Sequence, residues 1–193
     1  MTLRQKKFHR HRLRLLSIFT LCITVACSGS TSLSDDAINF KNQTLKDLLA
    51  LEAVVRPGLS QNHTAQFIDN AIKAFFNTII DRKKHGGCTV AVLDKDMQLI
   101  TGRVLQESSS QGDGIDPALR DYNYLKSEFK GIELNQIVQT ILYYRQNRIY
   151  VVSKSVNKDV EIVGFIFVAY HADGFEKQWG ISAEEFMKID FNS

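Results

Sequence analysis

The chain has 193 residues, 44% of them hydrophobic and 23% charged, which suffices for one domain with a proper core. Its formal charge is +3, but the first 26 residues hold six cations and no acid, and the remaining 167 hold 18 cations against 21 acids. The basicity therefore belongs to the N-terminal segment, and the remainder, at −3, has no basic footprint for nucleic acid.

The N-terminal segment has the pattern of a secretory signal. A basic stretch is followed by an apolar run over residues 15–26. A run of about a dozen residues is too short to cross a bilayer, which needs roughly 20. A basic head, a short apolar run and small residues at its end predict a signal peptide over residues 1–26.

The end of that run, TVAC at residues 24–27, resembles the lipobox of bacterial lipoproteins. The resemblance implies cleavage before Cys27, lipid on its thiol and new amino group, and a short tether over residues 27–33. Several acyl chains on one cysteine anchor a protein stably. Thr24 departs from the pattern, which usually has Leu, and the alternative is ordinary cleavage that leaves a soluble periplasmic protein. Ser28 resembles the signal that directs lipoproteins to the outer membrane.

The cysteines do not form a disulfide set. Cys22 would leave with the signal and Cys27 would carry lipid, so that only Cys88 remains. We expect Cys88 to be a buried residue that opens a strand, because free cysteine is among the most buried residue types. The alternative is a reactive thiol.

Two helices are predicted to open the domain, which we assign to residues 34–193. Ser34 is a suitable N-cap, and we expect the first helix to end at the Arg56-Pro57-Gly58 break. From Phe67 apolar residues recur in pairs every four residues, which indicates a second helix that ends at Gly86-Gly87.

The period then changes to two. Residues 89–93 and 97–105 predict a hairpin, and Asp94 and Asp96 are expected to shape its turn rather than to bind metal. Residues 107–117 are polar and Gly-rich and predict a loop. A short helix is expected over residues 117–129.

Three strands and a helix are predicted to complete the chain. The strands are expected at residues 137–144, 149–156 and 161–170, and the last is apolar on both faces, which is typical of a covered central strand. Ser182 and Glu185 form a possible capping box for a final helix over residues 182–189. Trp179 is expected to dock the C-terminal segment, the alternative being a contact with a partner.

This order of elements resembles the extracytoplasmic PAS-like domains of the single Cache family over about residues 64–175. The motifs that carry the resemblance are CTVAVLDKDMQLITG and RIYVVSKSVNKDVEIVGFIFVAY. The resemblance implies an α+β fold, with a five-stranded antiparallel sheet and a long N-terminal helix packed on one face. The segment between the second and third strands would cover the other face and enclose a pocket.

If the pocket exists, arginines could clamp a carboxylate and tyrosines could close around the ligand. The ligand would be a carboxylate or an amino acid. The alternative is that the tyrosines lie at core edges and the charges are solvated. The candidate residues are Arg120, Asp121, Tyr122, Tyr124, Tyr143, Arg145, Tyr150 and Ser153.

Enzymatic motifs are missing from the sequence. It contains no Gly-x-Ser-x-Gly, no His-Glu-x-x-His and no phosphate-binding glycine loop, and we expect no catalytic residue, metal or cofactor. The leading hypothesis is a lipid-anchored, periplasm-facing module that binds a small molecule or assists a partner sensor. The alternative is a structural or protein-interaction lipoprotein without a pocket.

Overall fold

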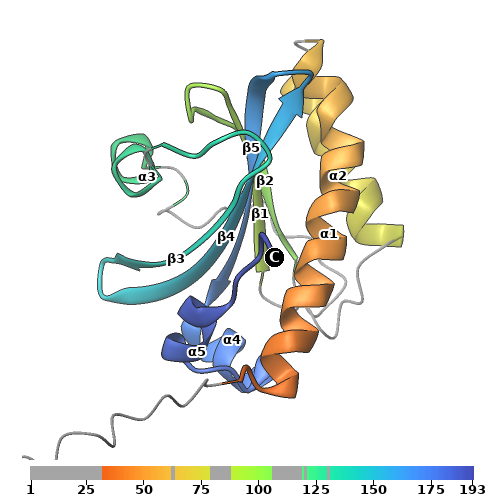
Figure 1. The fold of residues 1–193 in the computed structure, drawn as a ribbon. Helices are drawn as coiled ribbons and strands as arrows, with labels where there is room; N and C mark the ends of the chain where they lie inside the picture. Colours follow the sequence, from red (N-terminus) through yellow and green to blue (C-terminus); the bar gives the residue numbers. More distant parts are fainter. Residues whose placement is uncertain (1–31, 62–63, 79–87, 106–118, 120, 130) are drawn as a thin grey trace, which may run out of the picture. The chain divides into compact units, whose positions relative to one another are not determined.

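Five strands form one antiparallel sheet in the order β2-β1-β5-β4-β3 (Figure 1). The computed structural model describes residues 32–61, 64–78, 88–105, 119, 121–129 and 131–193. The strands are β1 (Cys88–Asp94), β2 (Leu99–Leu105), β3 (Ile137–Tyr144), β4 (Asn147–Lys158) and β5 (Glu161–His171). The helices are α1 (Asp35–Ser60), α2 (Ala65–Thr78), α3 (Tyr122–Glu128), α4 (Ala172–Trp179) and α5 (Ala183–Lys188).

The central strand β5 is buried on both faces, as predicted. Ile166, Val168 and Tyr170 contribute to one core, which lies under α1, α2, α4 and α5. Phe165 and Phe167 contribute to a second core, which lies under α3. The predicted α+β fold is confirmed, because a five-stranded antiparallel sheet carries a long helix on one face (Figure 1).

The first helix is longer than predicted. Ser34 caps it, with its Oγ accepting from the N–H of Ala37 at 3.1 Å, but it continues through Pro57 to Ser60. Proline removes one hydrogen bond of the helix, yet the turn still closes, because the N–H of Gln61 donates to the Pro57 carbonyl. Gly58 lets α2 approach closely, since a Cβ there would lie 2.6 Å from Ile68 Cγ1. The helix thus continues past Pro57 at the point where it packs against α2.

The second half of the chain contains a helix that sequence reasoning missed. α4 follows β5 directly and packs Phe175 against Phe40 and Tyr150. Trp179, at its end, packs edge-on with Phe40 at 5.1 Å, in agreement with the expected docking of this segment.

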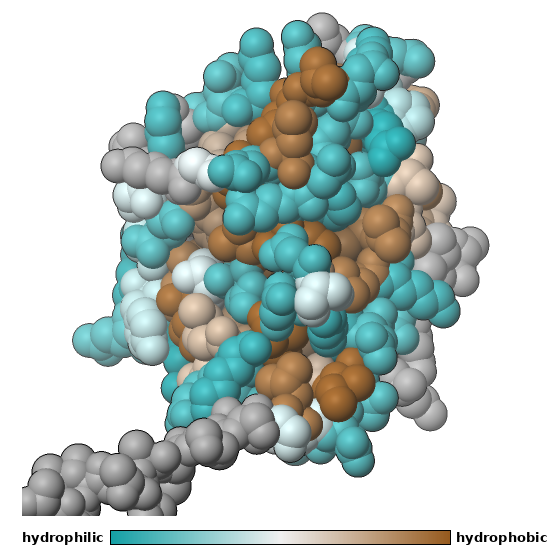
Figure 2. Space-filling model, in the orientation of Figure 1, coloured by the Kyte–Doolittle hydropathy of each residue, from teal (hydrophilic) through white to brown (hydrophobic). Residues whose placement is uncertain are grey.

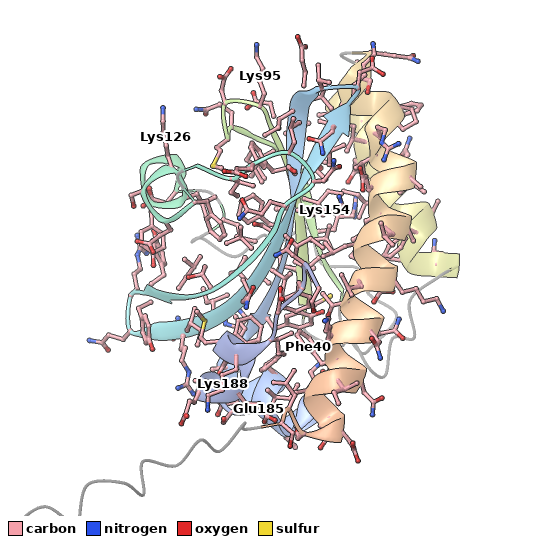
Figure 3. All side chains as sticks on the ribbon, viewed as in Figure 1. Phe40, Lys95, Lys126, Lys154, Glu185 and Lys188 are labelled. Atoms are coloured by element: carbon pink, nitrogen blue, oxygen red, sulfur yellow. The ribbon has the colours of Figure 1, made fainter. Side chains whose placement is uncertain are left out.

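The predicted helix over residues 182–189 corresponds to α5, but its capping box is only half formed. Ser182 Oγ accepts from the N–H of Glu185, whereas the Glu185 carboxylate accepts from the N–H of Ser34 at 2.8 Å. The glutamate therefore ties α5 to the start of α1, where Figure 3 shows it.

Other predicted boundaries differ by a few residues or cannot be compared. α2 begins at Ala65, and its expected end at Gly86-Gly87 lies outside the described residues, as does the loop at 107–117. Only residues 122–128 of the helix expected over 117–129 are in α3. Cys88 opens β1 and is buried, as expected.

A buried ion pair joins α1 to the sheet. Glu52 Oε2 lies 3.0 Å from Lys154 Nζ on β4, and both side chains are almost fully buried. Arg56 pairs with the other oxygen of Glu52 at 2.6 Å. Figure 3 shows Lys154 between the sheet and α1. Because a buried charge is costly without its partner, the pair favours one placement of the helix on the strand.

In the view of Figure 2, the described apolar side chains form several separate areas. These areas lie among hydrophilic side chains, and Ile38 and Leu49 are the exposed large apolar residues of α1. Scattered exposed apolar residues are ordinary on folded proteins.

Asp47 makes the stability of the fold depend on pH. Burial raises the pKa of its carboxyl from the usual 3.8 to about 6, although a hydrogen bond from Gln43 and the charge of Lys46 oppose the rise. Ionisation is therefore costlier in the folded chain than in the unfolded one. The native state loses stability as the pH rises from about 4 through 6.

We therefore expect the free energy of unfolding of the wild type to fall relative to that of Asp47→Asn as the pH rises from 4.5 to 7.5. At about 1.4 kcal/mol per pKa unit, the part of the shift that lies between pH 4.5 and about 6 sets an upper limit of about 2 kcal/mol. Urea unfolding of residues 33–193, which form one compact unit, measures it. Asp159→Asn, at an exposed turn, is the control. Parallel pH profiles for wild type and Asp47→Asn would contradict this role.

Candidate functional site

A groove of about 420 Å³ lies on the α3 side of the sheet, between the β1–β2 turn, α3 and the start of β5. Its size falls within the range of small-molecule sites. Charged side chains lie on its rim and apolar side chains form its floor. The described lining residues are Lys95, Asp96, Met97, Lys126, Phe129, Gly131, Ile132, Ile162 and Phe165.

The β1–β2 turn places two of the charged residues. Asp94 Oδ1 accepts from the N–H groups of Asp96 and Gln98 at 2.9 and 2.8 Å, which is the turn-forming role predicted for this aspartate. Met97 has a φ of 62° and turns its side chain inward, where it is buried. Lys95 and Asp96 are left exposed at the tip.

The short helix α3 places the opposite wall. Asp121 caps it by accepting from the N–H of Tyr124 at 3.1 Å. Phe129, just after the helix, packs edge-on against Phe167 of β5 at 4.7 Å and forms part of the floor. Lys126 is exposed on the helix, and Figure 3 shows it at the same end of the molecule as Lys95. Two ammonium groups therefore flank an apolar floor.

Three of the predicted site residues meet elsewhere on this side of the molecule. The hydroxyl of Tyr124 accepts from the N–H of Tyr143 at 3.1 Å and donates to its carbonyl at 3.3 Å. The ring of Tyr124 lies 5.6 Å from that of Tyr144, and the Arg145 guanidinium lies 5.4 Å from the same Tyr144 ring. These contacts fasten α3 to the end of β3.

The other predicted residues do not join them in one pocket. Tyr143 has its side chain 69% exposed, and Ser153 is buried with its Oγ donating to the Val138 carbonyl. Asp121 is occupied as the cap of α3. The side chains of Arg120 and Tyr122 lie outside the described residues.

Tyr150 lies on the opposite face of the sheet. Its ring stacks on Phe175 at 4.3 Å, and its hydroxyl donates to the Glu176 carboxylate, to which Arg148 also donates. Burial, followed by this hydrogen bond and the charge of Glu176, raises the pKa of Tyr150 well above 10. Tyr150 therefore joins β4 to α4. The expected single pocket is wrong in this respect, because alternate residues of a strand face opposite sides.

Sequence reasoning missed the residues that line the groove. Lys95 and Asp96 stand in a stretch that has an obvious turn role, and Lys126 is one exposed lysine among many. They line one groove only because the hairpin and α3 fold onto the same face of the sheet.

The described part of the chain supplies little else for chemistry. Within it, no cluster of three His, Cys, Asp or Glu side chains is placed to hold a metal ion. Burial, followed by the charge of Asp47, raises the pKa of the Cys88 thiol to about 12, which makes it a poor nucleophile. None of the described helices is both long and apolar enough to span a membrane.

No family model matches the chain, and no curated protein matches it. Among solved structures, it is similar to a domain of a sensory box/GGDEF family protein from Vibrio parahaemolyticus, with 11% identity and a TM-score of 0.49 over 78% of this chain and 60% of that one. It is also similar to the extracellular domain of a histidine kinase, with 11% identity and a TM-score of 0.39 over 79% of this chain and 64% of that one.

A third similar structure is the ligand-binding domain of a Campylobacter jejuni chemoreceptor in complex with 4-methylisoleucine. It shows 13% identity and a TM-score of 0.29 over 75% of this chain and 64% of that one. The chain thus spans about three-fifths of the length of each of the three. All three identities are 13% or lower and all three TM-scores are below 0.5. The α+β fold is therefore assigned from the sheet order and the covering helices of the chain itself.

The Tyr124 hydroxyl should stabilise α3 against β3. We expect Tyr124→Phe to lower the free energy of unfolding by about 1 kcal/mol and to speed hydrogen exchange at the Tyr143 amide. Tyr143→Phe removes a neighbouring hydroxyl that is exposed to solvent and is the matched control. Equal exchange rates in Tyr124→Phe and the wild type would show that the contact does not hold the helix.

Proposed function

We propose that the chain is a non-enzymatic ligand-binding or sensory module whose α3-side groove holds a small carboxylate with an apolar body. The observation that carries the proposal is the juxtaposition of Lys95 and Lys126 above an apolar floor. A carboxylate would pair with the ammonium groups, and an aliphatic chain would bury against Phe129 and Phe165. This division of polar and apolar contacts is typical of small-molecule sites.

Asp96 extends the proposal to amino acids. It lies on the same rim as Lys95 and is exposed, so that it can accept hydrogen bonds from a ligand ammonium group. An apolar amino acid would then place its carboxylate at the lysines, its amine at Asp96 and its side chain on the floor.

The residues around the groove support binding rather than catalysis. Its described lining contains no serine, cysteine or histidine that could act as a nucleophile or base. The second candidate is a structural or protein-interaction module without a ligand. It is favoured by the Tyr124 contacts, which occupy part of the site expected from the sequence.

We also propose that the module is exported and anchored through lipid on Cys27. The support is the signal-like segment over residues 1–26 and the TVAC stretch that ends it. The anchored domain would face the periplasm, with the outer membrane favoured by Ser28, and a partner sensor would receive its signal. Without lipidation, the chain would be a soluble periplasmic protein.

The groove is tested with three molecules that share one aliphatic group: L-leucine, 4-methylpentanoate and 3-methylbutylamine. We expect leucine and 4-methylpentanoate to raise the melting temperature of residues 33–193, because a ligand of the native state stabilises it. The amine should not. We expect Lys95→Ala plus Lys126→Ala to weaken calorimetric binding at least tenfold, since two charge-assisted contacts are lost.

Lys177→Ala, on the opposite side of the sheet, is the matched control and should bind as the wild type does. Failure of both carboxylates and of a wider amino-acid panel to stabilise the chain would contradict ligand binding. The protein-interaction alternative would then be favoured.

The anchor is tested by Cys27→Ala in the full-length chain expressed in a Gram-negative bacterium. We expect the wild type to fractionate with membranes and to incorporate labelled palmitate, and the variant to do neither. Cys88→Ala, which changes a thiol inside the fold, should retain the label. A membrane-bound variant with unchanged processing would contradict the proposal.

A further inference from the structure

A second, larger groove lies between α1 and the end of α4, on the face of the sheet opposite the α3-side groove. Its volume is about 610 Å³. One aromatic side chain and six polar ones form its described lining, which consists of Asp36, Asn39, Asn42, Gln43, Lys46, Gln178 and Trp179.

The polar residues follow one side of α1. Asp36, Asn39, Gln43 and Lys46 are spaced three or four residues apart, so that they lie on adjacent turns of the same helix face. At 1.5 Å per residue, the row is about 15 Å long. Asp36, Asn39, Asn42 and Lys46 are exposed, while Gln43 is half-buried. The row is therefore open to a ligand along its length.

The end of α4 holds the aromatic side chain at this row. Trp179 packs edge-on with the buried Phe40 and remains partly exposed. The next residue, Gly180, has a φ of 65°, and a Cβ there would lie 3.2 Å from Asp36 Oδ2. Glycine thus permits the close approach of α4 to α1 that sets Trp179 beside the polar row.

The composition of the groove selects the class of ligand. One acid and one lysine leave it without net charge, which does not suit a polyanion or an anionic lipid surface. Side-chain amides both donate and accept hydrogen bonds, as sugar hydroxyls do. An aromatic ring provides an apolar surface for the C–H face of a sugar ring.

From this combination we infer that the groove between α1 and α4 binds a neutral oligosaccharide. The amides on α1 bond to its hydroxyl groups, and Trp179 stacks against one ring. The length of the polar row requires more than one sugar unit. The site is separate from the α3-side groove and does not depend on the ligand proposed there.

The chain contains a single tryptophan, so its fluorescence reports on this groove directly. Residues 33–193, which form one compact unit, are titrated with chitotetraose, cellotetraose and maltotetraose. We expect at least one of them to change the Trp179 emission saturably, in the millimolar range. It should also protect the ring from acrylamide quenching.

Asn39→Ala plus Asn42→Ala tests the polar row. Both asparagines are exposed on α1, and alanine favours the helix, so the variant should fold. We expect its affinity for the active oligosaccharide to fall about tenfold or more, because hydrogen bonds to the ligand are lost. Asn70→Ala, an exposed asparagine on α2, is the matched control and should bind as the wild type does.

Trp179→Phe keeps an aromatic ring against Phe40 and is assayed by calorimetry. A loss of affinity in this variant supports stacking on the indole. The inference is overturned if none of the three oligosaccharides gives a saturable change. It is also overturned if the double asparagine variant binds as tightly as the wild type.

Discussion

The structure depends on one constraint, which is that β5 is apolar on both faces. Ile166, Val168 and Tyr170 point to one side and Phe165 and Phe167 to the other, and all five are almost fully buried. Full burial of such a side chain contributes about 1.5–3 kcal/mol, so neither face of the strand can be left in water without a large loss. The sheet must therefore be covered on both sides, and the helices supply those covers.

Among the described residues, the two covers are unequal, and both proposed sites lie at their margins. The 26-residue α1, with α2, α4 and α5, covers one face, whereas the described helical cover on the other face is the seven-residue α3. A short cover that ends beside a hairpin turn leaves the α3-side groove. On the other face, the polar groove lies between α1 and the end of α4, beside Trp179. Each groove thus results from the way in which a cover ends.

Polar contacts then select one arrangement of these layers. The buried Glu52–Lys154 pair favours one placement of α1 on the sheet. Some backbone groups of the edge strand β3 are already hydrogen-bonded to side chains. Asn192 bonds to the N–H and carbonyl of Ile137, and the Tyr124 hydroxyl bonds to the N–H and carbonyl of Tyr143. Such contacts occupy backbone groups that would otherwise be available to another strand. The last residues of the chain and α3 therefore help to keep the sheet at five strands.

The sequence by itself determined the features that depend on neighbouring residues: the Ser34 cap, the β1–β2 hairpin, the three later strands and the covered character of β5. It did not predict that α1 continues through Pro57 to pack against Ile68 of another helix. Nor did it identify α4 or separate Tyr150 from Tyr124, which lie on opposite faces of one sheet. The residues of both candidate grooves were likewise assembled only by the tertiary structure. Local hydrogen bonding and periodicity act over a few residues and can be read from the sequence. A binding site joins side chains from distant segments, and these meet only when the helices pack on the sheet.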